Sequence, residues 1–276
     1  MRRFILERPI GVIDSGVGGL TVVHELMRQL PREKLIYLGD TKRCPYGSRS
    51  EQEIKQFTWE MVVYLIKQNI KMLVIACNTA TAYTLKELQA ELSIPVIGVI
   101  RPGARTAIKE TNNNEVGIIG TDATIRSGAY PRALKGIHAN IIPHSLACPP
   151  FVPMVEAGVH AGPKADRIVS DTLAPLKKTN IDTLILGCTH YPLIRDTIQK
   201  AMGEAVTVIS SSEETARETS AMLEVHHLLN EGNHTAKHLF YTTGELELFT
   251  KITQTIFQDD NQSLQSITIH QAKLQS

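Results

Sequence analysis

Aromatic side chains make up only 5% of the 276 residues, and the charges nearly cancel, with 29 lysines and arginines against 28 aspartates and glutamates. Proteins that bind nucleic acids usually need the opposite, namely a basic surface and aromatic rings on which bases stack. A nearly neutral chain also has no general attraction to an anionic membrane surface. The composition therefore predicts neither nucleic acid nor a membrane as a partner.

Long apolar runs and closely spaced cysteines are absent as well. No run approaches the roughly 18 residues of a membrane-spanning helix, and Glu7 interrupts the N-terminal run Phe4–Leu6 before it could form the core of a signal peptide. The cysteines show no C-x-x-C spacing, which disfavours a zinc ribbon or a disulfide framework; they are Cys44, Cys77, Cys148 and Cys188. We therefore expect a reduced, cytoplasmic protein without a metal site.

Short apolar runs do occur, and they alternate with amphipathic stretches. The expected strands are residues 9–14, 35–39, 72–76, 95–100, 116–120, 141–142, 182–186, 206–209 and 239–242. Helices are expected from about 20 to 30, 50 to 68, 83 to 92, 103 to 111 and 164 to 178, from about 125, and from about 213 to 229, with an irregular, proline-rich connection at 149–158. This alternation is typical of parallel sheets and predicts an α/β protein. The length allows one large domain or two modest ones.

Two of the expected strands end at a cysteine. Residues 73–82 read LVIACNTATA and residues 184–192 read LILGCTHYP, so Cys77 and Cys188 each follow an apolar run and precede polar residues. The carboxyl ends of parallel strands face the ligand crevice, and the amides of a following helix would favour a thiolate there. A lone cysteine at a strand end is more often a small buried hydrophobe. The duplication argues for a shared role and suggests two similar lobes that face each other.

Two other segments offer polar groups at expected strand ends. Asp14 and Ser15 begin a glycine-rich turn after the first strand, and the loop after the second strand offers Tyr46 and Gly47. Both segments could contact a ligand through side chain or backbone. The alternative is that Asp14 or Ser15 only caps the next helix, and that Pro-Tyr-Gly is a surface turn.

Two strand-end thiols suit one reaction in particular, inversion at the α-carbon of an amino acid. A racemase needs a base on each face of that carbon, and the second group must return a proton. One cysteine would enter as thiolate and the other as thiol. Asp14 and His190 could relay protons to them, and groups suited to hold a zwitterion are Ser15, Tyr46, Gly47, Asn78, Thr79 and Thr189. No lysine stands out as a Schiff-base former, so we expect no pyridoxal cofactor.

Two other functions remain open on these residues. A thiol hydrolase or amidotransferase would use Cys77 or Cys188 as nucleophile, His190 as base and Glu156 as the orienting group. Glu156 stands in apolar surroundings that could raise its pKa, although such a carboxylate usually turns outward. A non-catalytic amino-acid-binding module is the third reading. The hydrolase leaves one thiol unused and the binding module leaves both unexplained, whereas Cys44 has no evident partner and receives no role in any of them.

Several motifs together resemble the glutamate racemases of the cofactor-independent aspartate/glutamate racemase superfamily. They are Asp14-Ser15-Gly16-Val17-Gly18-Gly19, Gly39-Asp40-Thr41 with Pro45-Tyr46-Gly47, Ala76-Cys77-Asn78-Thr79-Ala80, Phe151-Val152-Pro153 with Glu156, and Gly187-Cys188-Thr189-His190-Tyr191-Pro192. The resemblance implies two pseudo-symmetric α/β lobes with the active site between them. We expect one lobe to comprise residues 1–99 and 210–276 and the other to comprise 100–209.

The same resemblance implies roles for individual residues. Cys77 would deprotonate D-glutamate and Cys188 would deprotonate L-glutamate, assisted by Asp14, His190 and Glu156. The substrate would be held by Ser15, Tyr46, Gly47, Asn78, Thr79, Thr121 and Thr189, together with Asp14 and His190. The resemblance further implies that no cofactor is needed, that D-glutamate is supplied for peptidoglycan synthesis, and that the protein is a homodimer.

Overall fold

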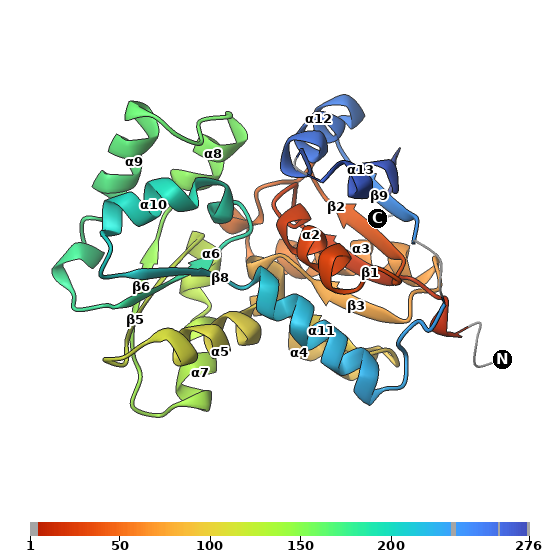
Figure 1. Cartoon of the computed structure of the whole chain (residues 1–276), viewed down its shortest axis with the longest axis horizontal. Helices are drawn as coiled ribbons and strands as arrows, with labels where there is room; N and C mark the ends of the chain where they lie inside the picture. Colours follow the sequence, from red (N-terminus) through yellow and green to blue (C-terminus); the bar gives the residue numbers. More distant parts are fainter. Residues whose placement is uncertain (1–4, 233–235, 259, 275–276) are drawn as a thin grey trace.

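The computed structural model describes residues 5–232, 236–258 and 260–274; the N-terminal residues 1–4, considered above for a signal peptide, lie outside them. The chain forms two lobes, each built on its own parallel sheet (Figure 1). Within the described residues, no helix is both long and apolar enough to cross a membrane. The α/β fold with parallel sheets flanked by helices is thus confirmed.

The larger sheet has six strands in the order β10-β9-β2-β1-β3-β4, and every neighbouring pair is parallel. Its strands are β1 (Ile10–Asp14), β2 (Leu35–Gly39), β3 (Met72–Ile75), β4 (Val96–Gly98), β9 (His238–Thr242) and β10 (Ile267–Gln271). The first three are completely buried because their side chains are apolar on both faces.

Helices cover both faces of this sheet. One face packs against α2 (Leu20–Gln29), α11 (Ser212–Val225) and α12 (Leu246–Ile256), and the other packs against α3 (Glu51–Ile66) and α4 (Asn78–Glu91). Short α13 (Asn261–Gln265) precedes β10. Helix α3 begins with a capping box, in which Ser50 and Glu53 each accept a hydrogen bond from the other's backbone amide.

The smaller sheet has four parallel strands in the order β6-β5-β7-β8. They are β5 (Glu115–Gly120), β6 (Ile142–Ala147), β7 (Thr183–Gly187) and β8 (Thr207–Ser210). One face is covered by α5 (Ile100–Glu110) and α7 (Ala129–Ile137), and the other by α8 (Phe151–Glu156), α9 (Pro163–Leu173) and α10 (Arg195–Met202). The remaining short elements are α6 (Asp122–Arg126), η1 (Tyr46–Ser48), η2 (Leu176–Lys178) and η3 (Tyr191–Ile194).

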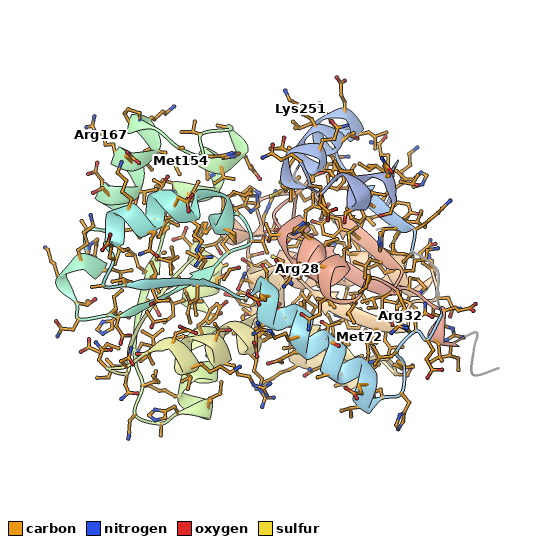
Figure 2. The ribbon with its side chains drawn as sticks, in the orientation of Figure 1. Arg28, Arg32, Met72, Met154, Arg167 and Lys251 are labelled. Atoms are coloured by element: carbon orange, nitrogen blue, oxygen red, sulfur yellow. The ribbon has the colours of Figure 1, made fainter. Side chains whose placement is uncertain are left out.

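The chain passes from one sheet to the other twice. It leaves the larger sheet between β4 and α5 and returns between β8 and α11, after which β9 pairs with β2. Helices α5 and α11 run close together where the lobes join (Figure 1), and Arg105 Nη1 lies 2.7 Å from Glu218 Oε1 across them. Side chains from both lobes lie along the junction near α5 and α11, whereas a gap separates α8 from α12 (Figure 2).

Two expectations about local structure are wrong. The proline-rich segment at 149–158 contains helix α8 rather than an irregular connection. Pro150 is its N-cap residue and Pro153 lies in its first turn, where a missing backbone N–H has no helical partner to lose. Helix α4 begins at Asn78 instead of near Tyr83, because Cys77 itself supplies the N-cap. Both differences bear on the site described below.

Acidification should destabilise the fold through His238. Its Nδ1 accepts the amide N–H of Leu35 at 3.2 Å, and burial, reinforced by the charge of Lys34, lowers its pKa from 6.5 to about 4. In the unfolded chain His238 becomes protonated below about pH 6.5, whereas in the folded chain it stays neutral down to about pH 4. The free energy of unfolding therefore falls as the pH drops through this window. The full loss is on the order of 3 kcal/mol.

The matched variant is His238→Asn, which keeps an acceptor for the Leu35 amide but does not titrate. Urea unfolding at a series of pH values should show a flatter stability profile for this variant between pH 6.5 and 4. The same slope in both proteins would contradict this assignment.

Candidate active site

The carboxyl ends of the two sheets meet around one small cavity. Its volume is about 10 Å³. Both lobes contribute to its lining, which comprises Ser15, Cys44, Pro45, Gly47, Cys77, Asn78, Thr79, Thr121, Val152, Cys188, Thr189 and His190. The structure therefore brings the two strand-end thiols into a single enclosure.

Cys77 lies between β3 and α4 and is the N-cap residue of that helix. Its Sγ accepts the amide N–H of Ala80 at 3.4 Å and donates to Ser15 Oγ at 3.5 Å. The helix amides favour a thiolate, as expected. Burial outweighs them, however, and together with the charge of Asp14 it raises the pKa of Cys77 from 9.0 to about 12. Cys77 is thus a neutral thiol at physiological pH.

Cys188 has a different neighbour, since its Sγ lies 3.9 Å from His190 Nδ1. Burial lowers the pKa of His190, but the contacts with Cys188 and Glu156 and the charge of Asp14 overcome it and raise that pKa to about 10. His190 Nε2 lies 3.4 Å from Glu156 Oε1, an ion-pair contact without the alignment of a hydrogen bond. A protonated imidazole therefore stands beside the Cys188 thiol group.

Asp14 lies fully buried at the end of β1, beneath the cavity. Its Oδ2 accepts the amide N–H groups of Gly16 and Gly19 at 3.0 and 3.1 Å, and its Oδ1 accepts the hydroxyl of Thr189 at 3.3 Å. Burial raises the pKa of Asp14, although His190 and these hydrogen bonds oppose the shift. The carboxyl group thus links the glycine-rich turn of one lobe to the polar strand end of the other.

Hydroxyl groups connect the lobes on the opposite side of the cavity. Thr79 Oγ1, on α4, lies 3.0 Å from the hydroxyls of both Thr121 and Thr124, which belong to the other lobe. The Tyr130 hydroxyl donates to Asn78 Oδ1 at 2.7 Å. Asn78, Thr79 and Thr121 were expected to bind substrate, but here Thr79 and Thr121 contact each other and Asn78 accepts a hydrogen bond from Tyr130.

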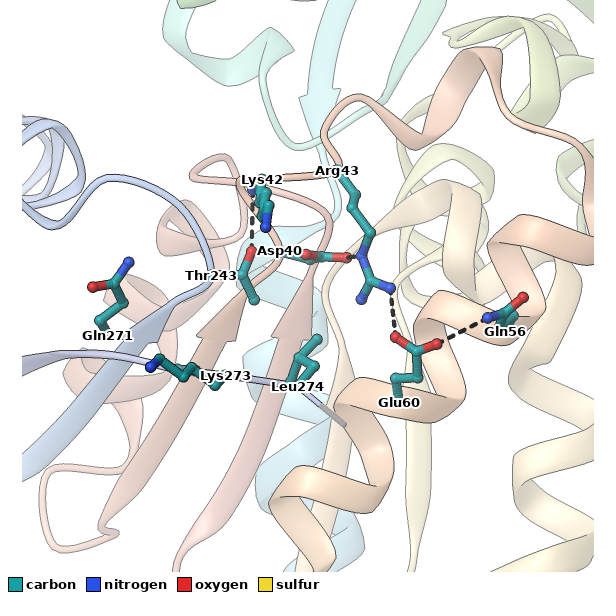
Figure 3. Close-up of a pocket in the computed structure, with 10 residues that line it drawn as sticks. Asp40, Lys42, Arg43, Gln56, Glu60, Thr243, Gln271, Lys273 and Leu274 are labelled. Carbon is teal, nitrogen blue, oxygen red and sulfur yellow. Dashed lines mark hydrogen bonds and ion pairs between the residues drawn. The ribbon is translucent and has the colours of Figure 1, made fainter. Parts of the chain in front are cut away.

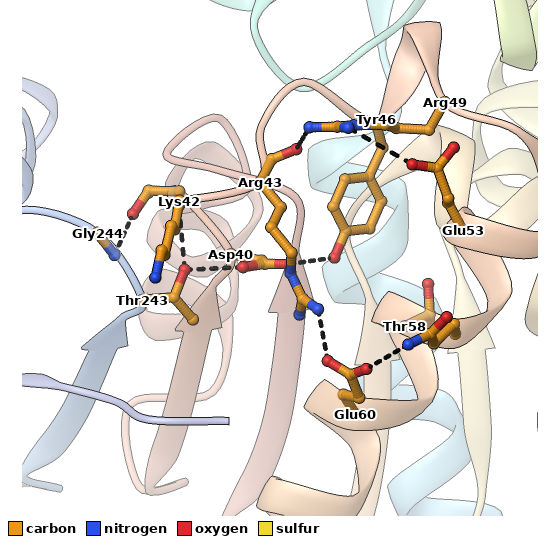
Figure 4. Close-up of polar contacts among 12 residues, drawn as sticks. Asp40, Lys42, Arg43, Tyr46, Arg49, Glu53, Thr58, Glu60, Thr243 and Gly244 are labelled. Atoms are coloured by element: carbon orange, nitrogen blue, oxygen red, sulfur yellow. Dashed lines mark hydrogen bonds and ion pairs between the residues drawn. The ribbon is translucent and has the colours of Figure 1, made fainter. Parts of the chain in front are cut away.

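Tyr46 does not offer its side chain to the cavity. The ring is buried against Phe57, and its hydroxyl donates to Asp40 Oδ2 at 2.5 Å (Figure 4). Only the main chain of Tyr46 is therefore available to bind a ligand in the cavity. Gly47 does line the cavity, and a Cβ there would lie 2.4 Å from that of Thr121, so only glycine allows this approach.

Asp40 is a buried residue whose importance the sequence did not reveal. Besides Tyr46, it accepts Arg43 Nε at 2.6 Å and the Thr243 hydroxyl at 2.7 Å. Arg43 also forms an ion pair with Glu60. Asp40, Arg43 and Glu60 form one wall of a neighbouring pocket of about 580 Å³ (Figures 3 and 4). For Asp40 the sequence offered two signals, its position directly after a buried strand and its place in the motif Gly39-Asp40-Thr41, but neither indicated which groups it would bind.

The expected site residues fall into three groups. Those that line the cavity are Ser15, Gly47, Cys77, Asn78, Thr79, Thr121, Cys188, Thr189 and His190. Asp14 lies beneath them, and Tyr46 turns its ring away. Glu156 lies at the end of α8, where it contacts His190 and accepts a hydrogen bond from Cys44 Sγ at 3.1 Å.

Comparison with known proteins identifies the family. Residues 10–219 match the sequence profile of the Asp/Glu/Hydantoin racemases. A glutamate racemase of Oceanobacillus iheyensis is 64% identical over 270 residues, which cover 98% of each chain. The solved glutamate racemase of Bacillus anthracis superposes with a TM-score of 0.89 at 47% identity, covering 97% of this chain and 98% of its own. That of Francisella tularensis, solved with D-glutamate, has a TM-score of 0.87 at 35% identity and covers 98% of both.

The chain therefore belongs to the Asp/Glu/Hydantoin racemase family, and within it to the glutamate racemases.

Replacing Asp40 by asparagine should loosen the loop that carries Gly47. The variant removes a buried charge from Arg43 and cannot satisfy the Tyr46 and Thr243 hydroxyls equally well. We expect a loss of roughly 3 kcal/mol in unfolding free energy and faster amide hydrogen exchange in residues 41–48. The control Glu60→Gln removes the other carboxylate on Arg43 but leaves Tyr46 and Thr243 bonded, so exchange in the loop should stay near the parent rate. Equal exchange in the two variants would refute the role given to Asp40.

Proposed function

We propose that the chain interconverts L-glutamate and D-glutamate by proton transfer at the α-carbon, with Cys77 and Cys188 as the two bases. The observation that carries this proposal is the single cavity between the sheets, which both thiols line. Groups that approach from opposite lobes can address opposite faces of one carbon, as inversion requires. The proposal also rests on the family and on a relative solved with D-glutamate.

The surroundings of the thiols suggest where each turnover begins. Cys77, with its pKa raised to about 12, is a proton donor, whereas Cys188 stands beside the protonated His190. The Cys188 thiolate takes the α-proton of L-glutamate, and the Cys77 thiol gives its proton to the opposite face of the carbanion. The resulting Cys77 thiolate and Cys188 thiol are then set for D-glutamate. These are the roles that the resemblance implies.

The remaining residues hold the substrate and tune the two thiols. Asp14 lies close enough to raise the pKa of Cys77, and Glu156 helps to keep His190 protonated. Donors for the carboxylates and acceptors for the ammonium group come from Ser15, Gly47, Asn78, Thr79, Thr121 and Thr189, and from the main chain of Tyr46. We assign binding to these groups because they surround the thiols and are polar.

Substrate binding requires the lobes to part. A cavity of about 10 Å³ has room for about one water molecule, far less than glutamate needs. We propose that residues 1–99 with 210–276 and residues 100–209 move as the two lobes. Their motion separates hydroxyl contacts such as that between Thr79 and Thr121.

Single replacements Cys77→Ser and Cys188→Ser test the mechanism. Each should lower kcat for racemisation by roughly 10³-fold or more, because serine is far too weak an acid to exist as an alkoxide here and each direction uses both groups. In deuterated water the parent enzyme should place deuterium at the α-carbon of the product before the remaining substrate exchanges. Cys148→Ser, at a buried cysteine that does not line the cavity, is the control.

The outcomes separate the alternatives. Loss of activity with only one of the two cysteine variants, together with ammonia release from glutamine, would support a thiol hydrolase instead. Binding of glutamate without turnover would support a binding module. A pyridoxal absorbance band that copurifies with activity would overturn the thiol mechanism.

The cellular context belongs to the same proposal. D-Glutamate made by this reaction would serve peptidoglycan synthesis in the cytoplasm, a compartment in keeping with four free thiols. We also expect a homodimer, as the resemblance implies, and sedimentation of the purified protein measures its oligomeric state directly.

A further inference from the structure

One cluster of reactive side chains joins two residues of the proposed mechanism to a third that has no part in it. Cys44, Glu156 and His190 each offer one potential ligand atom, and these atoms all lie within 4.8 Å of one another. Cys44 Sγ is 3.1 Å from Glu156 Oε1, and His190 Nε2 is 3.4 Å from the same oxygen. His190 has a task through its other nitrogen, but Cys44 has none.

The three side chains are a thiol, a carboxylate and an imidazole, which are the three ligand types of protein zinc sites. A tetrahedral zinc ion with bonds of 2.0–2.3 Å separates its ligand atoms by about 3.3–3.6 Å. The observed separations of 3.1 and 3.4 Å need only small adjustments to reach this range. Three protein ligands leave a fourth position for water.

A second observation points to a ligand at the same place. His190 is only 2% exposed, and its Nε2 has no hydrogen-bond partner within the described residues. That nitrogen faces the Glu156 carboxylate at a distance suited to a shared metal ion. The ion-pair contact with Glu156 lacks the alignment of a hydrogen bond, and a metal ion between the two groups would bind both of them.

The cluster can be reached from solvent without opening the lobes. Cys44 and Glu156 also line a separate cavity of about 350 Å³, whose far wall includes Leu248 and Ile252 of α12. The Glu156 side chain is 38% exposed. A hydrated cation can therefore approach through this cavity.

The three ligand atoms come from both lobes. Cys44 belongs to the loop that follows β2 of the larger sheet, whereas Glu156 ends α8 and His190 follows β7 of the smaller one. An ion held by all three would tie the lobes together around a cavity of about 10 Å³. Since glutamate cannot enter that cavity, the bound ion would keep substrate out.

We propose that Cys44, Glu156 and His190 form a binding site for Zn²⁺ or a similar thiol-binding divalent cation, and that the bound ion inhibits the enzyme by holding the lobes closed. Binding replaces the Cys44 thiol proton and the proton on His190 Nε2, and both protons pass to solvent. The His190 Nδ1 proton remains directed at Cys188. The inhibitory effect rests on the proposed function, whereas the binding itself does not.

Cobalt substitution tests binding independently of activity. The protein titrated with Co²⁺ should show a thiolate-to-cobalt charge-transfer band, and Zn²⁺ should displace it. Cys44→Ala should abolish the band, whereas Cys148→Ala, at another free cysteine, should retain it. An unchanged band in Cys44→Ala, or no band in the parent protein, would overturn the proposed site.

Inhibition tests the consequence of binding. Zn²⁺ should inhibit racemisation by the parent enzyme and a chelator should restore it. Measured against the activity of each protein without Zn²⁺, half-inhibition of Cys44→Ala should need a Zn²⁺ concentration higher than the parent enzyme needs, by at least the roughly tenfold that even outer-shell changes at metal sites cause. Equal Zn²⁺ sensitivity of Cys44→Ala and the parent would place the inhibitory ion elsewhere, for example on the two thiols of the cavity. If the protein does not racemise glutamate at all, the proposed function fails while the cobalt titration still decides the metal site.

Discussion

The rest of this structure depends on the burial of polar side chains between the two sheets. Asp14 and His190 are almost completely buried, and the groups around them exist in part to satisfy their charges. Neither lobe could bury these groups alone, because the partners of Asp14 include Thr189 of the other sheet. The closed form is therefore held by the same polar contacts that prepare the site for chemistry.

This burial also explains why two similar thiols behave differently. Both follow a buried strand, yet burial and the charge of Asp14 keep the proton on Cys77, whereas the cationic His190 stands beside Cys188. If the two thiols had identical surroundings, nothing in the site would distinguish one from the other. The difference therefore lies in the surroundings of the two thiols rather than in the thiols themselves.

Much of this could be predicted from sequence where the signal is local. Strand-end positions of Cys77 and Cys188 follow from apolar runs that stop at polar residues, because buried parallel strands leave that pattern. Helix α8 was missed because two prolines look like helix breakers, although in the first turn they break nothing.

Contacts between segments that are far apart in the sequence could not be predicted from local patterns. Asp40 meets Thr243 only after β9 has joined β2, and Cys44 meets Glu156 across 112 residues of sequence. Spacing rules for metal sites assume ligands on one or two neighbouring segments, so they could not suggest a site shared by two lobes. The expectation that no metal would bind followed from those rules.

The double crossing between the sheets also sets an order of events during synthesis. The smaller sheet is made from one continuous stretch of chain, ending with β8, and can assemble as soon as that stretch has left the ribosome. The larger sheet cannot, because α11, which packs in one core with β1 and α2, and the strands β9 and β10 are made last. The strands β1 to β4 are therefore made before the helix and the strands that complete their sheet. During that interval the apolar face of α2 is uncovered, and exposed apolar surface of this kind makes a nascent chain prone to aggregation.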